Sequence, residues 1–221
     1  MDTTLAKSTQ HACNLLLNSG LTEDGSLGAM SNAAIANLIA KLKDIFEKKH
    51  YVWSTNNLIG IRTSDVYTDE FTDIGIIVEG DSLMAYPIST KPGMKYLDHP
   101  ENANGCACLK EGQYLNMWQF HDEFNGWTGD PYMMQVSPCN VYREVNHGTS
   151  INRNAHVDTG LFGVNYHSWK GFNSEHVANL SAGCQTMNES VLVGEVLPHL
   201  EKSFKGTPTT YTLIHTDDFK A

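Results

Sequence analysis

The sequence after Tyr51 consists of short apolar runs separated by turns, and no other feature limits the possible folds as much. Residues 58–62, 73–78 and 82–88 are three such runs, and the Glu-Gly-Asp sequence at 79–81 has the composition of a hairpin turn. Runs this short are typical of strands rather than helices. Because turns are so frequent, most neighbouring strands are expected to pair antiparallel, in a β sandwich or barrel.

Six more runs have the same character, and one stretch near the C-terminal end has helical spacing. The further strand candidates are residues 105–109, 113–120, 132–136, 140–143, 160–166 and 209–215. The helical stretch is 190–204, where Pro198 is expected to kink or shorten the helix. No internal repeat or linker interrupts this region, so residues 51–221 are predicted to be one domain.

Residues 1–50 have helical spacing instead. Residues 4–18 are compatible with one helix that Gly20 can terminate, and a second helix is expected behind Ser31 as its N-cap. We therefore predict an α+β protein, mainly β, in which a small helical module precedes the β-rich domain 51–221.

The charge balance argues against one class of partner. The 221 residues carry a formal net charge of −10 at pH 7, and the lysines and arginines are scattered. Repulsion from phosphate groups therefore makes nucleic acid an unsuitable partner.

The N-terminus has no basic region followed by an apolar run, and nowhere do about 18 apolar residues follow one another. We expect a monomer that does not insert into membranes and is made in the cytoplasm without an export signal of its own.

Five cysteines occur, an odd number without a secretory signal, so a disulfide framework is not expected. Cys106 and Cys108 would share one face of a strand, where two small core residues are a simpler explanation than half of a metal site. The histidines are dispersed, and no His-Glu-x-x-His or other zinc spacing accompanies them. We therefore expect neither a metal nor any other cofactor.

Cys184 and His167 are the main candidates for chemistry. Cys184 directly follows Ser181-Ala-Gly183, a small and flexible sequence that allows a tight turn and an accessible sulfur. His167 ends a strand-like run and can accept the thiol proton. Ser168 can orient the imidazole through its hydroxyl or its carbonyl oxygen, and the amides of Gly183 and Cys184 can serve as oxyanion donors. The residues alone leave a second interpretation open, in which a buried cysteine merely lies beside a strand-end histidine.

Three further polar residues could contact a substrate. Arg62 ends an apolar strand and could bind a carboxylate, although an ordinary structural ion pair explains it equally well. Asn165 and Gln185 flank the Cys/His pair and could hydrogen-bond a substrate backbone. Asn165 would share a strand face with His167.

Several other residues are alternatives of lower rank. Tyr114, Tyr166 and Trp169 could wall a groove, but aromatic residues at such spacings are more often part of the core. His156 and His176 could replace His167 as the base, yet neither follows a strand-like apolar run.

The segments around these residues resemble enzymes of the bacterial cell wall. His167-Ser168 and Ser181-Ala-Gly-Cys184 resemble the signature of the L,D-transpeptidase family, in which a histidine precedes Ser/Thr-His-Gly-Cys. A longer series of motifs is similar to a group of phage and prophage peptidoglycan hydrolases. The similar segments are Leu58-Ile-Gly-Ile-Arg62, Ser89-Thr-Lys-Pro-Gly93, Leu109-Lys-Glu-Gly-Gln-Tyr114, Val141-Tyr-Arg143, Gly160-Leu-Phe-Gly-Val-Asn-Tyr-His167 and Leu180-Ser-Ala-Gly-Cys-Gln185.

The resemblance implies an L,D-transpeptidase-like fold and roles for the site residues. In that family the cysteine attacks a carbonyl of a peptidoglycan stem peptide, the upstream histidine is its base, and the next residue orients that histidine. Cys184, His167 and Ser168 would take these three roles here. The residues that would face the substrate are Arg62, Asn165, Tyr166, Ser181 and Gln185.

This sequence also departs from the two patterns. Ala182 stands where transpeptidases have a histidine, which removes one donor, and Ser168 stands where the phage pattern has an arginine, which removes a cation.

Near the N-terminus, Asp24-Gly-Ser-Leu-Gly28 resembles the Asp-Gly-x-Phe-Gly loop of short peptidoglycan-binding modules. A helical hairpin that merely packs on the main domain is the alternative for that segment.

We therefore predict a peptidoglycan-degrading cysteine hydrolase, an endolysin, that cleaves a stem-peptide or cross-link amide through an acyl-enzyme on Cys184. On the resemblance, a holin releases it at lysis, so that it acts on peptidoglycan in the periplasm or cell wall. Two alternatives stay open. One is an L,D-transpeptidase that forms cross-links, and the other is a catalytically idle wall-binding or virion protein.

Overall fold

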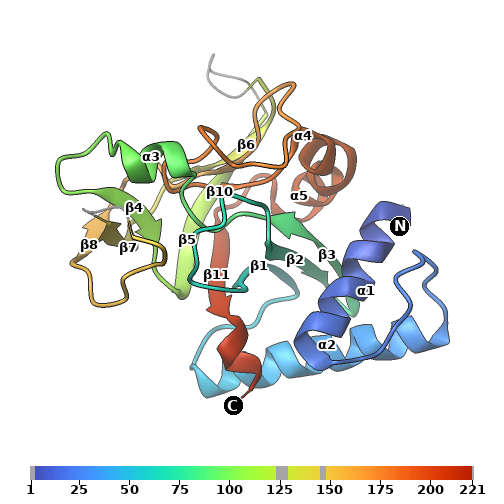
Figure 1. Cartoon of the computed structure of the whole chain (residues 1–221). Helices are drawn as coiled ribbons and strands as arrows, with labels where there is room; N and C mark the ends of the chain where they lie inside the picture. Colours follow the sequence, from blue (N-terminus) through green and yellow to red (C-terminus); the bar gives the residue numbers. More distant parts are fainter. Residues whose placement is uncertain (1–2, 123–128, 145–147, 221) are drawn as a thin grey trace.

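The computed structural model describes residues 3–122, 129–144 and 148–220, and it is an α+β protein made mainly of strands (Figure 1). This is the fold class predicted from the sequence. The elements in chain order are α1 (Thr3–Leu17), α2 (Ala29–Lys48), β1 (Asn56–Arg62), β2 (Asp73–Glu79), β3 (Ser82–Ile88), α3 (Met94–Asp98), β4 (Cys106–Leu109), β5 (Gly112–His121), β6 (Tyr132–Gln135), β7 (Cys139–Glu144), β8 (Val157–Gly160), β9 (Tyr166–His167), β10 (Gln185–Thr186), α4 (Glu189–Val191), η1 (Leu192–Val196), α5 (Leu197–Phe204), β11 (Thr209–His215) and η2 (Thr216–Phe219).

Eight strands form one sheet in the order β10-β9-β6-β5-β11-β1-β2-β3, and its two edges meet. Most neighbouring pairs are antiparallel, as predicted, whereas β1 with β11 and β9 with β10 are parallel. At the meeting point the Ser89 N–H donates to the Thr186 carbonyl at 2.7 Å, and the Thr186 N–H donates to the Ser89 carbonyl at 3.0 Å. This bridge nearly closes the sheet into a barrel and ties β10 to the end of β3. A second, smaller sheet has the order β4-β7-β8.

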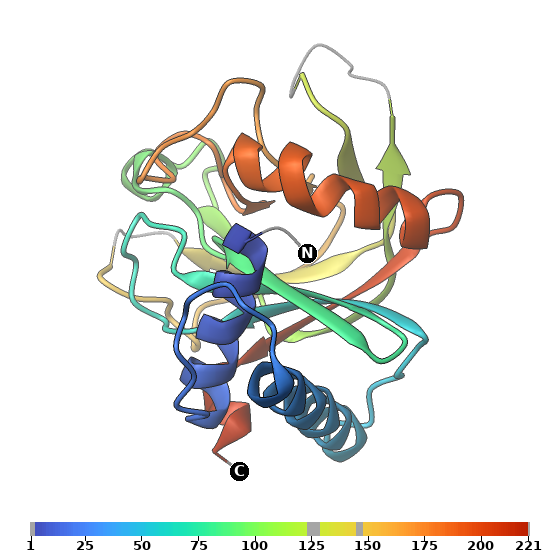
Figure 2. The same ribbon diagram turned by 90° about the vertical axis from the view of Figure 1, so that its right-hand side faces the viewer.

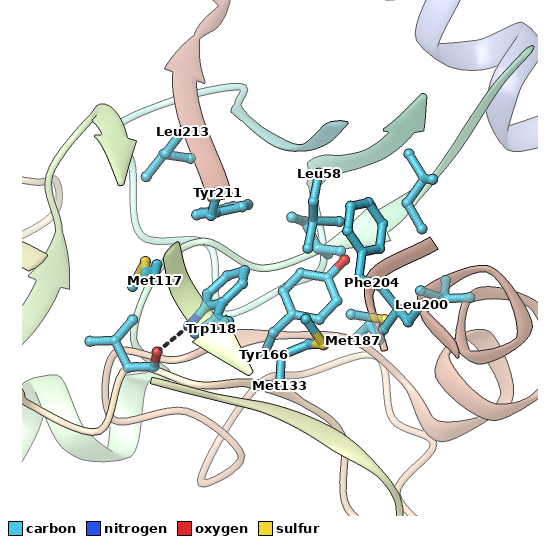
Figure 3. Packing of buried hydrophobic residues seen from close by; sticks show 14 of the residues in the cluster. Leu58, Met117, Trp118, Met133, Tyr166, Met187, Leu200, Phe204, Tyr211 and Leu213 are labelled. Carbon is cyan, nitrogen blue, oxygen red and sulfur yellow. Dashed lines mark hydrogen bonds between the residues drawn. The ribbon is translucent and has the colours of Figure 1, made fainter. Parts of the chain in front are cut away.

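The interior of the barrel holds large aromatic side chains (Figure 3). The Trp118 ring lies 5.2 Å from the Tyr166 ring and 4.4 Å from the Tyr211 ring, centroid to centroid. The Trp118 indole N–H donates to the Val164 carbonyl at 2.7 Å, and the Tyr166 hydroxyl donates to that of Tyr86 at 2.5 Å. A buried polar group without a partner costs about 1–3 kcal/mol, so these bonds let polar aromatic residues fill an apolar core.

The first three strands of the chain are buried on both faces because α1 and α2 cover the outer one (Figure 2). In β3, Met84 and Tyr86 belong to the interior cluster, whereas Leu83 and Ala85 belong to the cluster that contains the helices. Two buried faces explain why β2 is apolar at nearly every position instead of alternating. The N-terminal helices thus share a hydrophobic cluster with the sheet, and a wall-binding role for them stays a prediction.

Both predicted helix boundaries shift slightly. α2 begins at Ala29 with Gly28 as its N-cap, so Ser31 lies inside the first turn, where its hydroxyl accepts the Gln10 side-chain N–H at 3.2 Å. α1 ends at Leu17, and the first residue after it in the left-handed region is Asn18, with φ 54°. Asparagine tolerates this conformation better than most residues, so the chain turns before it reaches the predicted glycine.

The predicted strand 160–166 is wrong, since β8 and β9 are separate strands with a loop between them. In the loop Gly163 has φ 72°, which interrupts an extended run. The backbone N–H groups of Phe162 and Val164 donate to the Gln135 side chain instead of to a neighbouring strand. A side chain distant in sequence therefore replaces the strand pairing that the apolar run suggests.

The predicted helix near the C-terminal end is present but not uniform. It consists of α4, the π-helical turn η1 and α5, and Pro198 lies directly after the junction of η1 and α5, so the irregular turn lies beside the residue that cannot donate a helical N–H. Among the helices of the described ranges, none combines the length and the apolar composition needed to cross a membrane.

We expect Thr9→Val to lower the free energy of unfolding by about 1–3 kcal/mol. The buried Thr9 hydroxyl accepts the backbone N–H of Ala85 at 3.0 Å, so α1 satisfies a donor on β3. Valine keeps the shape but removes the acceptor. Urea denaturation measures the change, and Ser8→Ala, one residue away, should stay within about 0.5 kcal/mol of wild type. Equal stability of Thr9→Val and Ser8→Ala would contradict this role.

Candidate active site

The turn that carries Cys184 is fixed by the Ser181 hydroxyl. This hydroxyl accepts the Gly183 N–H at 3.1 Å and donates to the Cys184 carbonyl at 2.8 Å. Gly183 has φ +135°, and a Cβ built there would lie 2.2 Å from the Ala107 carbonyl oxygen of β4. Only glycine meets both conditions, so the small residues before the cysteine are a geometric requirement.

The Cys184 sulfur lies between two backbone groups of the loop that precedes β9. The thiol donates to the Gly163 carbonyl at 3.3 Å, and the Asn165 N–H donates to the sulfur at 3.4 Å. Cys184 is 8% exposed and lines a hollow of about 320 Å³, whose walls include Trp169 and Ala182. Burial raises the pKa of the thiol to about 11, and the Asn165 N–H lowers it by a smaller amount. The resting sulfur is therefore a neutral thiol.

His167 ends β9 and pairs in register with Thr186, and Cys184 directly precedes β10. The parallel register places Tyr166 beside Gln185, and both of these side chains belong to the barrel interior. Because strand residues alternate, the His167 side chain leaves the ladder on the face opposite to Tyr166. The Asn165 side chain accepts the Gln135 N–H of β6 at 2.9 Å, and its expected contact with a substrate backbone stays a prediction.

The imidazole of His167 is held by its neighbour in sequence. Its Nδ1 lies 3.0 Å from the Ser168 carbonyl oxygen. A carbonyl can only accept, so Nδ1 carries the proton and Nε2 has the lone pair that a base requires. Burial lowers the pKa of His167 to about 4, although the Ser168 carbonyl opposes this change. The contact is the one expected between the histidine and the residue after it, and its catalytic role stays a prediction.

Both members of the pair are neutral at pH 7. With the thiol pKa raised to about 11 and the imidazole pKa lowered to about 4, transfer of the proton from sulfur to imidazole is unfavourable in the resting site. The two hydrogen bonds of the sulfur found in the described residues go to the loop backbone, not to the imidazole. Any proton transfer must therefore accompany attack on a bound substrate instead of preceding it.

Several residues expected to face the substrate lie elsewhere. The Tyr166 side chain is fully buried in the barrel, and the Gln185 side chain accepts the Tyr211 hydroxyl there at 2.9 Å. Ser181 is also fully buried and holds the turn. The Gly183 N–H is already bound to that serine, which leaves the Cys184 N–H as the oxyanion donor of the two that were expected.

The Arg62 side chain lies inside the protein, away from solvent. Its guanidinium is fully buried and pairs with Glu111 at 2.6 Å. The same guanidinium donates to the Thr90 and Leu109 carbonyl oxygens, both at 2.9 Å. Each of its three nitrogens thus has a partner within the protein, which corresponds to the structural ion pair left open as the alternative.

Neither alternative base lies at the Cys184 sulfur. His156 is exposed and pairs with Asp158 at 2.8 Å, and the His176 backbone forms a bridge with Glu70 on the surface. Among the aromatic candidates, Tyr114 is buried in the core and Trp169 lines the hollow.

The cysteines and acidic residues do not gather into a metal centre within the ranges that the structure describes. Cys106 and Cys108 are both buried on β4, in a small apolar cluster. They act as core residues there, which is the simpler of the two interpretations of their spacing. Burial also raises their pKa values, to about 12 for Cys106 and about 11 for Cys108, so both are neutral thiols.

Sequence reasoning missed Gln135, whose side chain binds the loop that holds the Cys184 sulfur. It is buried at the end of β6 and bonds to the backbone of residues about 25–29 positions later in the chain. No local signal marks it, because a single glutamine at a strand end has no motif around it.

Comparisons with known proteins give a distant match among solved structures. Neither the family models nor the curated proteins include one that matches the sequence. Among solved structures, the crystal structure of L,D-transpeptidase 1 from Mycobacterium tuberculosis aligns with a TM-score of 0.27 and 11% identity. The alignment covers 72% of this chain and 62% of that one, so this chain spans less than two thirds of the length of that protein. At this score the likeness carries no argument about the site.

Proposed function

We propose that the protein is a cysteine hydrolase that cleaves amide bonds in peptidoglycan peptides. One observation carries the proposal. A glycine-dependent turn holds the Cys184 thiol at the wall of a hollow, directly before β10, and β10 pairs with the strand that ends in His167, whose Nε2 has the lone pair. A thiol, a base and a backbone N–H at one place are the parts that acyl transfer requires.

Because the Cys184 thiol and the His167 imidazole are both neutral at rest, proton transfer between them is part of the attack on the substrate. As a substrate carbonyl enters the hollow, the Cys184 sulfur attacks its carbon, and the thiol proton passes to Nε2 of His167 in the same step. The Cys184 N–H faces the developing oxyanion. The imidazolium then returns the proton to the leaving amine, which gives the acyl-enzyme. Water attacks this thioester next and loses its proton to His167, so the acid product and the free thiol are restored.

The substrate class rests on the motif resemblance. The ordered segments between residues 58 and 185 are similar to phage and prophage peptidoglycan hydrolases, which favours an endolysin that is released to the cell wall at lysis. The two N-terminal helices and their Asp-Gly-Ser-Leu-Gly loop would add glycan contacts. A monomer without cofactor is sufficient for this chemistry.

The proposal is tested with purified protein and muropeptides, with the products read by mass spectrometry. The wild type should break one peptide bond and gain the acyl fragment on Cys184 when the reaction is quenched early. Cys184→Ala should leave the muropeptides intact, whereas Cys13→Ala, which removes a thiol buried under the helices, should retain the cleavage. Identical products from the wild type and Cys184→Ala would overturn the proposal.

A catalytically idle wall-binding protein is the second candidate, because both members of the pair are buried and neutral. Such a protein would sediment with insoluble peptidoglycan without changing any bond. A transpeptidase would instead yield cross-linked dimers when an amine acceptor is added to the muropeptide assay.

A further inference from the structure

We infer that Gln135 is a positioning residue that holds the Cys184 thiol in place through the loop between β8 and β9. The role of this loop in catalysis rests on the proposed function, but its contacts do not. Gln135 is buried, and among the described residues the hydrogen bonds of the Cys184 sulfur and of the His167 imidazole go to other groups. It therefore acts on the thiol through the loop.

The side chain of Gln135 uses both ends of its amide on the loop. Its Oε1 accepts the N–H of Phe162 at 3.0 Å and that of Val164 at 2.9 Å. Its Nε2 donates to the Gly160 carbonyl at 3.1 Å. These three bonds replace the strand pairing that the loop lacks, and they span the residues on both sides of Gly163.

Three further bonds fix the position of Gln135 itself, one of which runs from its Nε2 to the Cys139 sulfur at 3.3 Å. Its Nε2 donates to the Ser137 carbonyl at 3.0 Å, and its backbone N–H donates to the Asn165 side-chain oxygen at 2.9 Å. Asn165 is the residue whose own N–H donates to the sulfur. Gln135 therefore binds the loop at both ends, at Gly160 and at Asn165.

The loop presents two groups of opposite kind to the sulfur. The Gly163 carbonyl accepts the S–H and so sets the direction of the thiol, and the Asn165 N–H favours the thiolate character that develops during attack. Gly163 lies in the left-handed region with open space around its Cα, so the loop can move there if nothing holds it. The Gln135 amide is the restraint that keeps these two groups on the sulfur.

Gln135→Leu tests the inference, because leucine fills similar space without any hydrogen bond. Hydrolysis of muropeptides should fall by about 10–100-fold, mainly in kcat, since a small misplacement of a reacting group has this effect. Alkylation of Cys184 by iodoacetamide should accelerate at pH 8, and the midpoint of its pH profile should move from near 11 toward an ordinary thiol value, because the freed sulfur gains access to water. Slower hydrolysis together with faster alkylation of Cys184 would indicate that the thiol has lost its position but not its accessibility.

Three controls separate this result from general unfolding. Mass spectrometry should find Cys184 alone alkylated, with the other four thiols still protected. Gln119→Leu, at an exposed position of the adjacent strand β5, should leave both rates unchanged. Gln135→Glu keeps an acceptor for Phe162 and Val164 but cannot donate to Gly160, and it should give intermediate rates; it also serves as the test if the leucine variant does not fold.

Failure of the Gln135 inference and failure of the proposed function give different results. Unchanged hydrolysis, an unchanged Cys184 profile, or alkylation of all five thiols together in both Gln135 variants would overturn the inference. A wild type that hydrolyses no muropeptide would refute the proposed function. In that case the alkylation profiles of the folded proteins still decide whether Gln135 positions the thiol.

Discussion

Gly183→Ala should lower the free energy of unfolding by about 3 kcal/mol or more. The backbone there has φ +135°, a region that costs a side-chain-bearing residue about 1–3 kcal/mol. The new Cβ would also lie 2.2 Å from the Ala107 carbonyl oxygen, so β4 or the turn must shift, at a further cost of about 1–3 kcal/mol. Urea denaturation at pH 7 measures the sum.

Two other glycines supply matched controls for this experiment. Gly194→Ala, in η1 with open space around it, should be neutral or stabilise by about 0.5–1 kcal/mol. Gly163→Ala has space for the methyl group but keeps the left-handed φ of 72°, so it should cost about 1 kcal/mol. If Gly183→Ala cost no more than Gly163→Ala, the close approach of the turn to β4 would be refuted.

Acid should destabilise the protein through His167 by about 3 kcal/mol between pH 6.5 and pH 4. The unfolded histidine binds a proton near pH 6.5, whereas burial lowers the pKa in the folded protein to about 4. The folded state therefore binds fewer protons in this window. The contribution of His167 is fully present above pH 6.5 and is lost as the pH falls through about 4.

This prediction is checked by urea denaturation at several pH values from 4 to 8. His167→Gln should remove that part of the pH dependence, so its stability relative to wild type should rise by about 3 kcal/mol on going from pH 7 to pH 4. His99→Gln, at an exposed position, should follow the wild-type curve. If the free energies of unfolding of wild type and His167→Gln changed in parallel with pH, the pKa of His167 would be the same in the folded and unfolded states, which would contradict the prediction.

Local pattern was sufficient for most of the fold. Strands such as β1, β2, β3 and β11 were predictable because each is a short apolar run between turns, and burial on two faces makes that signal stronger. The strand expected at 160–166 was wrong for the opposite reason. Its apolar residues belong to a loop whose backbone partner is a side chain from β6, and no periodicity encodes that contact.

The local geometry around Cys184 and His167 could be predicted from the sequence, but the side-chain partners of the other candidate site residues could not. The turn before Cys184 and the contact of His167 with Ser168 depend on residues adjacent in sequence. Arg62 depends on distant ones, because Glu111 lies 49 positions away and decides that the guanidinium is part of the core. Tyr166 and Gln185 could not be assigned either, since the direction of their side chains follows from a parallel register that only the closed sheet defines.

The position of β11 in the middle of the main sheet has a consequence for the order of events during synthesis. β11 is the last strand in the chain, yet it joins β1 to β5. Until residues 209–215 leave the ribosome, the nascent chain holds two half-sheets with open edges, which are prone to pair with other chains. β3 lies in one half and β10 in the other, so the bridge between Ser89 and Thr186 has no stable frame before then. The sheet can therefore close between β3 and β10 only when the central strand has been made.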